Sequence, residues 1–137
     1  MKFLDLNGLK HLLKFMDRTV SVVSGNFQPD SHGTRNIPFI TNHQIISNNL
    51  SGNINVFNWF KGASEGGILE IVPTGSLGVE LYCSDDMKTS IMYKMEVVPP
   101  NPPKLNKCDS LSLSYNSYAR LIKLDGKLIV AEYIKNQ

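Results

Sequence analysis

The first twenty residues carry a helical pattern of apolar positions. Leucine, methionine and valine recur there at alternating intervals of three and four residues, at Leu6, Leu9, Leu13, Met16 and Val20. This spacing is the narrow a/d seam of a coiled coil. Asp5 is placed to cap a helix over residues 6–17. Because an isolated helix of this length is marginal in water, we expect it to dock on another surface.

Opposite charges flank this seam. With Leu6 at heptad position a, Asp5 takes position g and Lys10 takes position e. This offset pairs charges between parallel neighbouring helices, so the pattern favours self-association. The predicted oligomer or attachment interface consists of Asp5, Leu6, Leu9, Lys10, Leu13 and Met16. The spacing leaves one alternative open, in which the same residues pack on the protein's own body.

Beyond residue 20 the pattern becomes extended. We expect brief strands at 20–23, 37–40 and 54–60, and further strands at 68–72, 78–83, 90–98 and 111–115, because Gly, Pro, Ser and Asp bound these runs. The clearest unit joins residues 119–124 to 127–134 through Asp125-Gly126. Asp-Gly supplies the positive φ angles of a type I′ turn, so this unit is predicted to be a β-hairpin.

Strand 90–98 has two different faces. Ile91, Tyr93, Met95 and Val97 alternate with more polar positions, which predicts one buried face and one polar face. A proline-rich run at 99–103 follows as a stiff crossing between sheet elements. Together these segments predict a mainly β fold, an antiparallel β-sandwich or jelly roll preceded by one short helix. The expected organisation is an N-terminal helix over residues 1–20 and a single β-sandwich domain over residues 21–137.

Composition narrows the function classes. The 137 residues are 42% hydrophobic and 19% charged, and their net charge is +2. These values exclude a disordered charged tail and disfavour nucleic-acid binding, which needs a concentrated positive field. No charged residue lies between Arg35 and Lys61. A surface without charges is cheap to desolvate, so residues 36–60 are expected to contact neighbouring subunits or to pack on their own core.

No catalytic pattern is apparent. His11, His32 and His43 lack metal-ligand spacing, and no nucleophile elbow or phosphate-binding loop is present. We therefore expect no enzyme activity, no metal and no cofactor. Cys83 and Cys108 are read as free thiols of a reducing compartment. With no secretory signal or membrane-length apolar segment, we expect a cytoplasmic product that has no membrane partner.

Exposed aromatic rings would support a different function. Sugar-binding sites on β-sandwiches stack rings on pyranose faces. For Trp59 we favour a position in the core or at an interface over a glycan platform, and among the aromatic residues it remains the first candidate for a glycan or partner contact. Tyr115 and Tyr118 form the next candidate cluster. A carbohydrate- or host-receptor-binding module is therefore the second hypothesis.

The opening residues resemble a known leader. Phe3-Leu4-Asp5-Leu6-Asn7-Gly8-Leu9-Lys10-His11-Leu12 is similar to a pattern, "(F/Y)LD-x-NGL-x-x-(F/L/W)", found at the start of tail, fibre and other virion proteins of gut-bacterial phages. The likeness covers about ten of 137 residues. Leu12-Leu13 replace the usual tryptophan, and a long repetitive shaft is absent.

The resemblance implies a function and a location. In that group the leader is a short helix that trimerises a fibre or attaches it to the particle. Our first hypothesis is therefore a non-enzymatic structural component of a bacteriophage virion. It would form a homo-oligomer, a trimer by this resemblance, and bind other virion proteins after assembly in the host cytoplasm. A host-surface glycan enters as a partner only under the second hypothesis.

Overall fold

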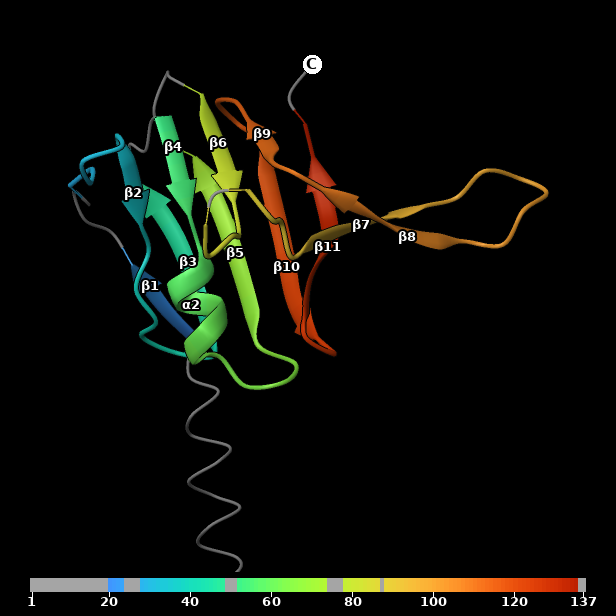
Figure 1. Ribbon diagram of the computed structural model, residues 1–137, viewed down its shortest axis with the longest axis horizontal. Helices are drawn as coiled ribbons and strands as arrows, with labels where there is room; N and C mark the ends of the chain where they lie inside the picture. The colour runs from blue at the N-terminus through green and yellow to red at the C-terminus, as the bar shows by residue number, and fades with distance from the viewer. Residues whose placement is uncertain (1–19, 24–27, 49–51, 74–77, 87, 136–137) are drawn as a thin grey trace, which may run out of the picture.

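The computed structural model describes residues 20–23, 28–48, 52–73, 78–86 and 88–135. In these ranges the protein is mainly β, with eleven strands in two sheets and one short helix (Figure 1). The predicted leader helix and its seam lie outside the described residues. The mainly β fold class predicted from the sequence is confirmed.

The larger sheet has seven strands and the smaller has four. In spatial order, the larger contains β1 (Val20–Val23), β3 (His43–Asn48), β5 (Ile68–Pro73), β10 (Tyr118–Leu124), β11 (Lys127–Ile134), β7 (Met92–Glu96) and β8 (Lys104–Cys108). The smaller contains β2 (Thr34–Asn36), β4 (Gly52–Asn55), β6 (Val79–Tyr82) and β9 (Leu111–Leu113). The helix, α2 (Phe57–Gly62), follows β4.

The early strands alternate between the two sheets. As a result β1, β3 and β5 pair in parallel in the larger sheet, and β2, β4 and β6 pair in parallel in the smaller one. The expectation of a wholly antiparallel arrangement is therefore wrong. Antiparallel pairing joins β10 to β5 and β11, β7 to β8, and β6 to β9. The physical reason is that each of these strands is followed by a strand of the opposite sheet. When the chain comes back to the first sheet, it runs in the same direction as before, so the two strands of that sheet are parallel.

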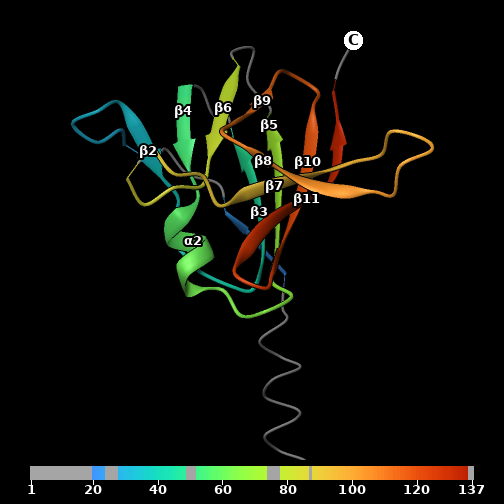
Figure 2. The same cartoon turned by 45° about the vertical axis from the view of Figure 1, so that its right-hand side comes forward.

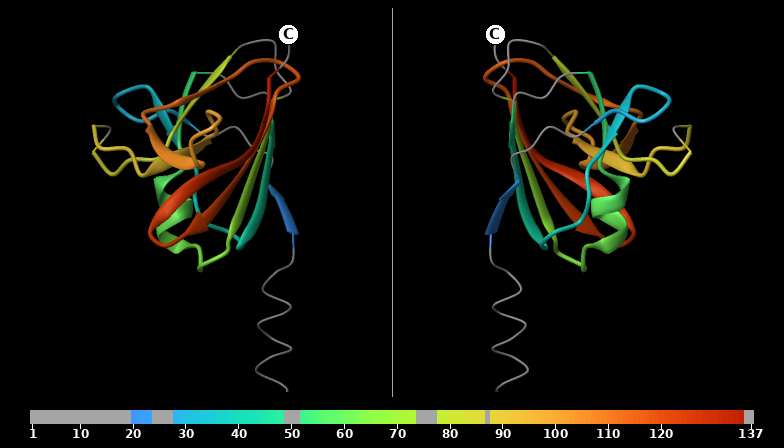
Figure 3. Two further views of the ribbon diagram at one scale, coloured as in Figure 1. Left: turned by 90° about the vertical axis from the view of Figure 1, so that its right-hand side faces the viewer. Right: turned by 90° about the vertical axis from the view of Figure 1, so that its left-hand side faces the viewer.

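One hydrophobic core lies between the sheets. The larger sheet contributes Ile46, Leu69, Ile71 and Leu121, and the smaller contributes Ile54, Leu81 and Leu113, all buried. Fully burying one such side chain contributes about 1.5–3 kcal/mol. Figure 3 shows the long strands of the larger sheet on one side of the molecule and α2 on the other.

The helix corrects the strand that we expected over residues 54–60. The strand β4 ends at Asn55, whose side-chain oxygen accepts hydrogen bonds from the backbone N–H groups of Phe57 and Ser84. The chain then turns into α2, so Phe57 and Phe60 stack as an i, i+3 pair with ring centroids 6.3 Å apart. No strand forms at 37–40, where Pro38 lacks an N–H donor.

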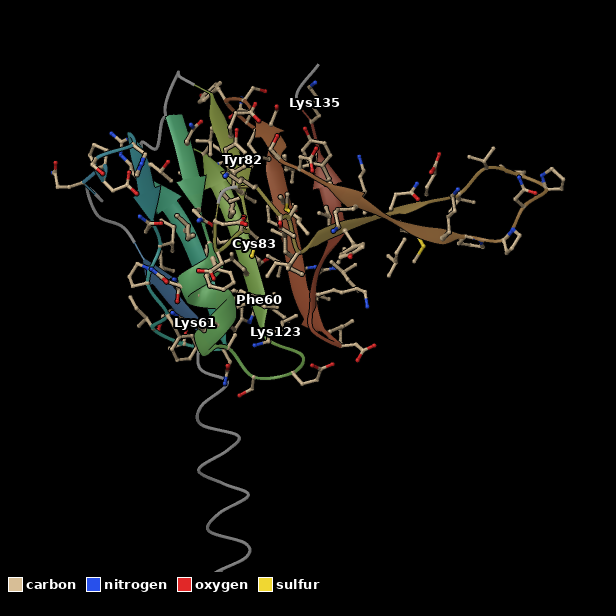
Figure 4. All side chains as sticks on the ribbon, viewed as in Figure 1. Phe60, Lys61, Tyr82, Cys83, Lys123 and Lys135 are labelled. Carbon is tan, nitrogen blue, oxygen red and sulfur yellow. The ribbon has the colours of Figure 1, made fainter. Side chains whose placement is uncertain are left out.

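Lys123 fixes α2 against the larger sheet. Its ammonium group donates hydrogen bonds to the carbonyl oxygens of Phe60 (2.6 Å) and Ala63 (2.8 Å) at the end of the helix. It also lies 4.5 Å from the centroid of the Phe60 ring (Figure 4). A cation at a helix C-terminus is favourable because the last carbonyl groups carry partial negative charge. The helix is therefore held over the inner side of the sheet.

The uncharged stretch at 36–60 supplies core rather than surface at most of its apolar positions. Ile37, Ile46, Ile54, Val56 and Trp59 are buried within the chain. Phe39 and Ile40 are exposed. The structure thus supports packing on the protein's own core for the buried positions of this segment.

The predicted hairpin is confirmed. Asp125 and Gly126 have φ angles of 51° and 70°, as a type I′ turn requires, and Leu124 pairs with Lys127 across it. Farther along, β11 holds an extra residue, Ala131, between the partners of Arg120 and Leu121. This bulge keeps Val130 on the inner side and Glu132 on the outer side of the sheet.

A second hairpin projects from the body. The strand β7 pairs with β11 through Met92, Tyr93 and Lys94, and then continues beyond the body with β8 as its partner (Figures 1 and 2). The proline-rich run forms the tip, where the N–H of Asn101 donates to the carbonyl of Val98. It joins two neighbouring strands of one sheet and does not cross between sheets. We call residues 95–105 the arm.

Candidate interaction surface

The larger sheet carries apolar side chains on both sides. Strand alternation and the pairing register place one set of aliphatic and aromatic side chains on the side opposite the core. We call this surface the outer face, with apolar members Val20, Val22, Ile45, Ile68, Val72, Tyr93, Ile122, Ile129 and Ile134. An antiparallel or mixed sheet with one solvated side ordinarily carries polar residues there.

One row of this face crosses six strands. The register connects Val20, His43, Ile68, Ile122, Ile129 and Tyr93 in turn. At the edge strand, Val22 is 63% exposed, and the central isoleucines are half-buried by their neighbours in the sheet. Apolar side chains that the described residues leave partly open across several strands are typical of a surface that contacts another molecule.

The arm extends the outer face. Met95 pairs with Leu105 and lies on the same face as Tyr93, two residues earlier in β7. Met95 is 50% exposed and Val97 is 60% exposed. The predicted buried face of Ile91, Tyr93, Met95 and Val97 is wrong for Met95 and Val97, whereas Ile91 packs against the core and Tyr93 is half-buried. The strand leaves the body after Lys94, so Met92 is the β7 side chain that reaches the core.

A polar cluster interrupts the aliphatic rows. The Glu70 carboxylate accepts a hydrogen bond from the hydroxyl of Tyr118 and lies 2.6 Å from Nε2 of His43. Burial alone raises the pKa of Glu70, but the hydrogen bonds from Tyr118 and His43 outweigh it and hold that pKa below its ordinary value. Burial and the Glu70 contact raise the pKa of Tyr118 to about 12, so its hydroxyl remains a donor.

Three further contacts of charged side chains frame this cluster. The Arg120 guanidinium lies 3.4 Å from the Glu132 carboxylate, and Arg120 Nε is a buried donor with no acceptor among the described residues. At the arm end of the face, the ammonium groups of Lys107 and Lys127 lie 5.9 Å and 5.7 Å from the Tyr93 ring centroid. The carboxylates at the centre of the face are thus paired within the chain.

The candidate aromatic residues fall in three different environments. Trp59 is fully buried, and its ring N–H donates to the carbonyl oxygen of Thr41 at 3.0 Å. The core position that we favour for Trp59 is therefore confirmed, and the glycan-contact alternative is wrong, because the ring has no exposed surface. Tyr118 lies on the outer face with its hydroxyl bonded to Glu70. Tyr115 is half-exposed near the turn before β10.

Sequence reasoning missed the outer face, although a signal was present. The runs Ile68-Leu69-Glu70-Ile71-Val72 and Leu128-Ile129-Val130 are apolar at odd and even positions alike. Such runs are typical of strands covered on both sides. The seam residues Asp5, Leu6, Leu9, Lys10, Leu13 and Met16 lie outside the described residues, so the structure does not place them.

The described ranges hold no group of three or more His, Cys, Asp or Glu side chains arranged to bind a metal ion. In the same ranges, no helix has the length and apolar character needed to cross a membrane. The sequence matches no protein-family model, and the searches of curated proteins and of solved structures return no match.

The first prediction concerns Trp59. Trp59→Ala is expected to lower the free energy of unfolding by about 3–5 kcal/mol, because it leaves a cavity in the core. Urea denaturation followed by circular dichroism measures this change. If the alanine variant does not fold, Trp59→Phe replaces it and should still lose stability, because the hydrogen bond to Thr41 is gone.

Asn58→Ala is the matched control, since Asn58 is the exposed neighbour of Trp59 in α2. This change should alter stability by no more than about 0.5 kcal/mol. Equal effects at the two positions would contradict the core position of Trp59.

The second prediction concerns the pKa of Glu70. Removing the donor with Tyr118→Phe should raise the pKa of the Glu70 carboxyl, as followed by an NMR titration of its carboxyl carbon. Because the folded pKa lies below the unfolded value of about 4.3, Glu70 stabilises the fold above that pH. This contribution is lost as the pH falls through the folded pKa.

Glu70→Gln should therefore cost more stability at pH 7 than at pH 3. Chemical denaturation at the two pH values measures the difference. A Glu70 pKa that is unchanged in Tyr118→Phe, or an equal cost at both pH values, would show that these hydrogen bonds do not hold the carboxylate.

Proposed function

We propose that the protein is a non-enzymatic structural component of a bacteriophage virion that acts by self-assembly. The observation that carries this proposal is the apolar outer face, which extends from β1 to the arm. The resemblance of residues 3–12 to phage virion leaders supports a location in a phage particle. In this proposal the two sheets form a β-sandwich body, and the leader directs its association into a trimer.

The chemistry of the outer face favours a protein partner over a glycan. Most of its apolar positions are β-branched aliphatic side chains, among them Ile45, Ile68 and Ile122. A sugar needs an open ring platform with free polar groups beside it, whereas Tyr118 and Glu70 bond to each other. An aliphatic surface gains most by packing against another aliphatic surface, and a second copy of this chain supplies one.

Because the carboxylates of the outer face are paired, covering them with a second copy costs little free energy. Covering an isolated charge costs several kcal/mol, whereas a hydrogen-bonded pair loses less on leaving water. Glu70 has Tyr118 and His43 as partners, and Glu132 has Arg120. The leader and the face act together, because a helix as short as the leader is marginal by itself. Loss of either surface therefore weakens the assembly.

The third prediction tests the outer face. Ile122→Asp places a charge in its central row, where the half-buried side chain tolerates the change without opening the core. We expect light scattering to show an oligomer for the wild type and a lower mass for the variant. Circular dichroism should show the same fold for both.

Asn58→Asp is the charge-matched control, because Asn58 is exposed on α2, which lies over the inner side of the larger sheet. This variant should keep the wild-type mass. A monomeric wild type at particle-like concentration, or an unchanged mass for Ile122→Asp, would overturn self-assembly through this face.

The fourth prediction tests the leader. Leu9→Asp combined with Leu13→Asp should lower the mass of the assembly measured by light scattering, because both leucines belong to the a/d seam. An unchanged mass would assign the seam to packing within one chain. Mass spectrometry of purified phage particles tests the virion location, since a structural component is present there in many copies.

A further inference from the structure

The arm projects from the body and has apolar side chains on both of its sides (Figures 1 and 2). Met95 pairs with Leu105 on the side of the outer face. Val97 and Val98 directly precede Pro99, and extended backbone, which a following proline favours, places successive side chains on opposite sides. These four apolar side chains are between 37% and 60% exposed. A flat protein surface covers one side of such a hairpin, whereas a fluid apolar medium surrounds both.

The tip of the arm is uncharged over residues 97–103, which are two valines, four prolines and one asparagine, all exposed. Few backbone donors there need water, because prolines have no N–H group and the N–H of Asn101 already donates to the carbonyl of Val98. A hairpin end of this length reaches roughly 10 Å at about 3.3 Å per residue. Interfacial elements enter a bilayer to a depth of about 5–10 Å, so the tip has a suitable length.

The positive charge of the protein is concentrated in the same hairpin. Residues 92–108 contain three lysines and one glutamate, and this net charge of +2 equals that of the whole chain, so the remaining residues are neutral in sum. The lysines lie on the strands behind the tip, at Lys94, Lys104 and Lys107. The carboxylate, Glu96, accepts a hydrogen bond from the Asn106 side chain. A bilayer presents anionic headgroups just outside its acyl chains, which matches an apolar tip followed by lysines.

We propose that the tip of the arm inserts into the surface of a bilayer that contains anionic lipids. Val97 and Val98 enter among the acyl chains, and the lysines lie at the level of the headgroups. We expected no membrane partner because the sequence has no membrane-length apolar segment. A tip that enters only the interface needs no such segment. The contact goes beyond self-assembly, and it uses residues past Lys94, the last β7 residue paired with β11.

The fifth prediction tests the tip by sedimentation with vesicles. The wild type should bind vesicles of phosphatidylglycerol and phosphatidylcholine, and bind pure phosphatidylcholine vesicles more weakly, because the lysines then lack anionic partners. Val98→Asp should weaken binding to the anionic vesicles about tenfold, as expected for losing the burial of one valine side chain. Val98 follows Glu96 on the side of the hairpin away from the outer face, so the mass measured by light scattering should stay at the wild-type value.

Ile40→Asp is the matched control. Ile40 is 52% exposed and Val98 is 51% exposed, so both changes remove an exposed apolar side chain and add one negative charge. Ile40 precedes β3, which lies near the opposite edge of the larger sheet from the arm. This variant should bind the anionic vesicles as the wild type does.

Two further variants separate insertion from adsorption by charge. A tryptophan introduced by Val98→Trp should be quenched by phospholipids brominated in their acyl chains, while the fully buried Trp59 of the wild type gives the background. Lys104→Gln combined with Lys107→Gln should weaken binding to the anionic vesicles about fivefold for each lysine. Lys61→Gln combined with Lys135→Gln, at exposed lysines outside the hairpin, should leave binding unchanged.

The outcomes decide the proposal. Absence of binding to anionic vesicles, equal binding by Val98→Asp and Ile40→Asp, or no quenching by the brominated lipids would each overturn insertion of the tip. Binding that high salt abolishes and Val98→Asp leaves unchanged would assign the contact to the lysines alone and likewise overturn it. Self-assembly through the outer face is judged by the mass of Ile122→Asp, so the two proposals fail separately.

Discussion

The structure depends on one constraint: the seven-stranded sheet carries apolar side chains on two sides, and the described residues supply one covering layer. On the inner side, Leu69 and Ile71 meet the four-stranded sheet and α2. On the outer side, Ile68 and Val72 come from the same strand and remain half-buried. Each Å² of apolar surface left in water forgoes about 25 cal/mol. Covering the outer side with a second layer therefore lowers the free energy of the folded protein.

The path of the chain explains why the described elements cover the inner side of the sheet. Alternation between the sheets places β2, β4 and β6 on one side of β1, β3 and β5, so the connections build the inner layer. Lys123 then holds α2 on that same side through the carbonyl groups of Phe60 and Ala63. The hairpin of β7 and β8 is the described element that is free to reach outward, and it projects away from the body.

Local signals predicted some of this fold, and long-range pairing set the rest. The β10–β11 hairpin was predictable because Asp125 and Gly126 determine their own backbone angles. The parallel pairs were not predictable, because no local residue determines which of the two sheets a strand joins. The strand expected over residues 54–60 was wrong for a related reason: the run suits a strand, but Asn55 ends β4 and a helix begins at Phe57. The apolar runs of β5 and β11 marked the outer face without showing what covers it.

The polar cluster sets the free-energy cost of covering the centre of the outer face. Both oxygens of the Glu70 carboxylate have contacts, with Tyr118 and with His43, so any apolar surface can cover them at moderate cost. Arg120 differs, because its Nε has no acceptor in the described residues and its contact with Glu132 spans 3.4 Å. This donor is already buried and unsatisfied within the chain, so its cost of about 1–3 kcal/mol belongs to the fold and does not change when the face is covered. In the proposed assembly, aliphatic packing therefore supplies the affinity, and the paired carboxylates limit the cost of covering the charged centre of the face.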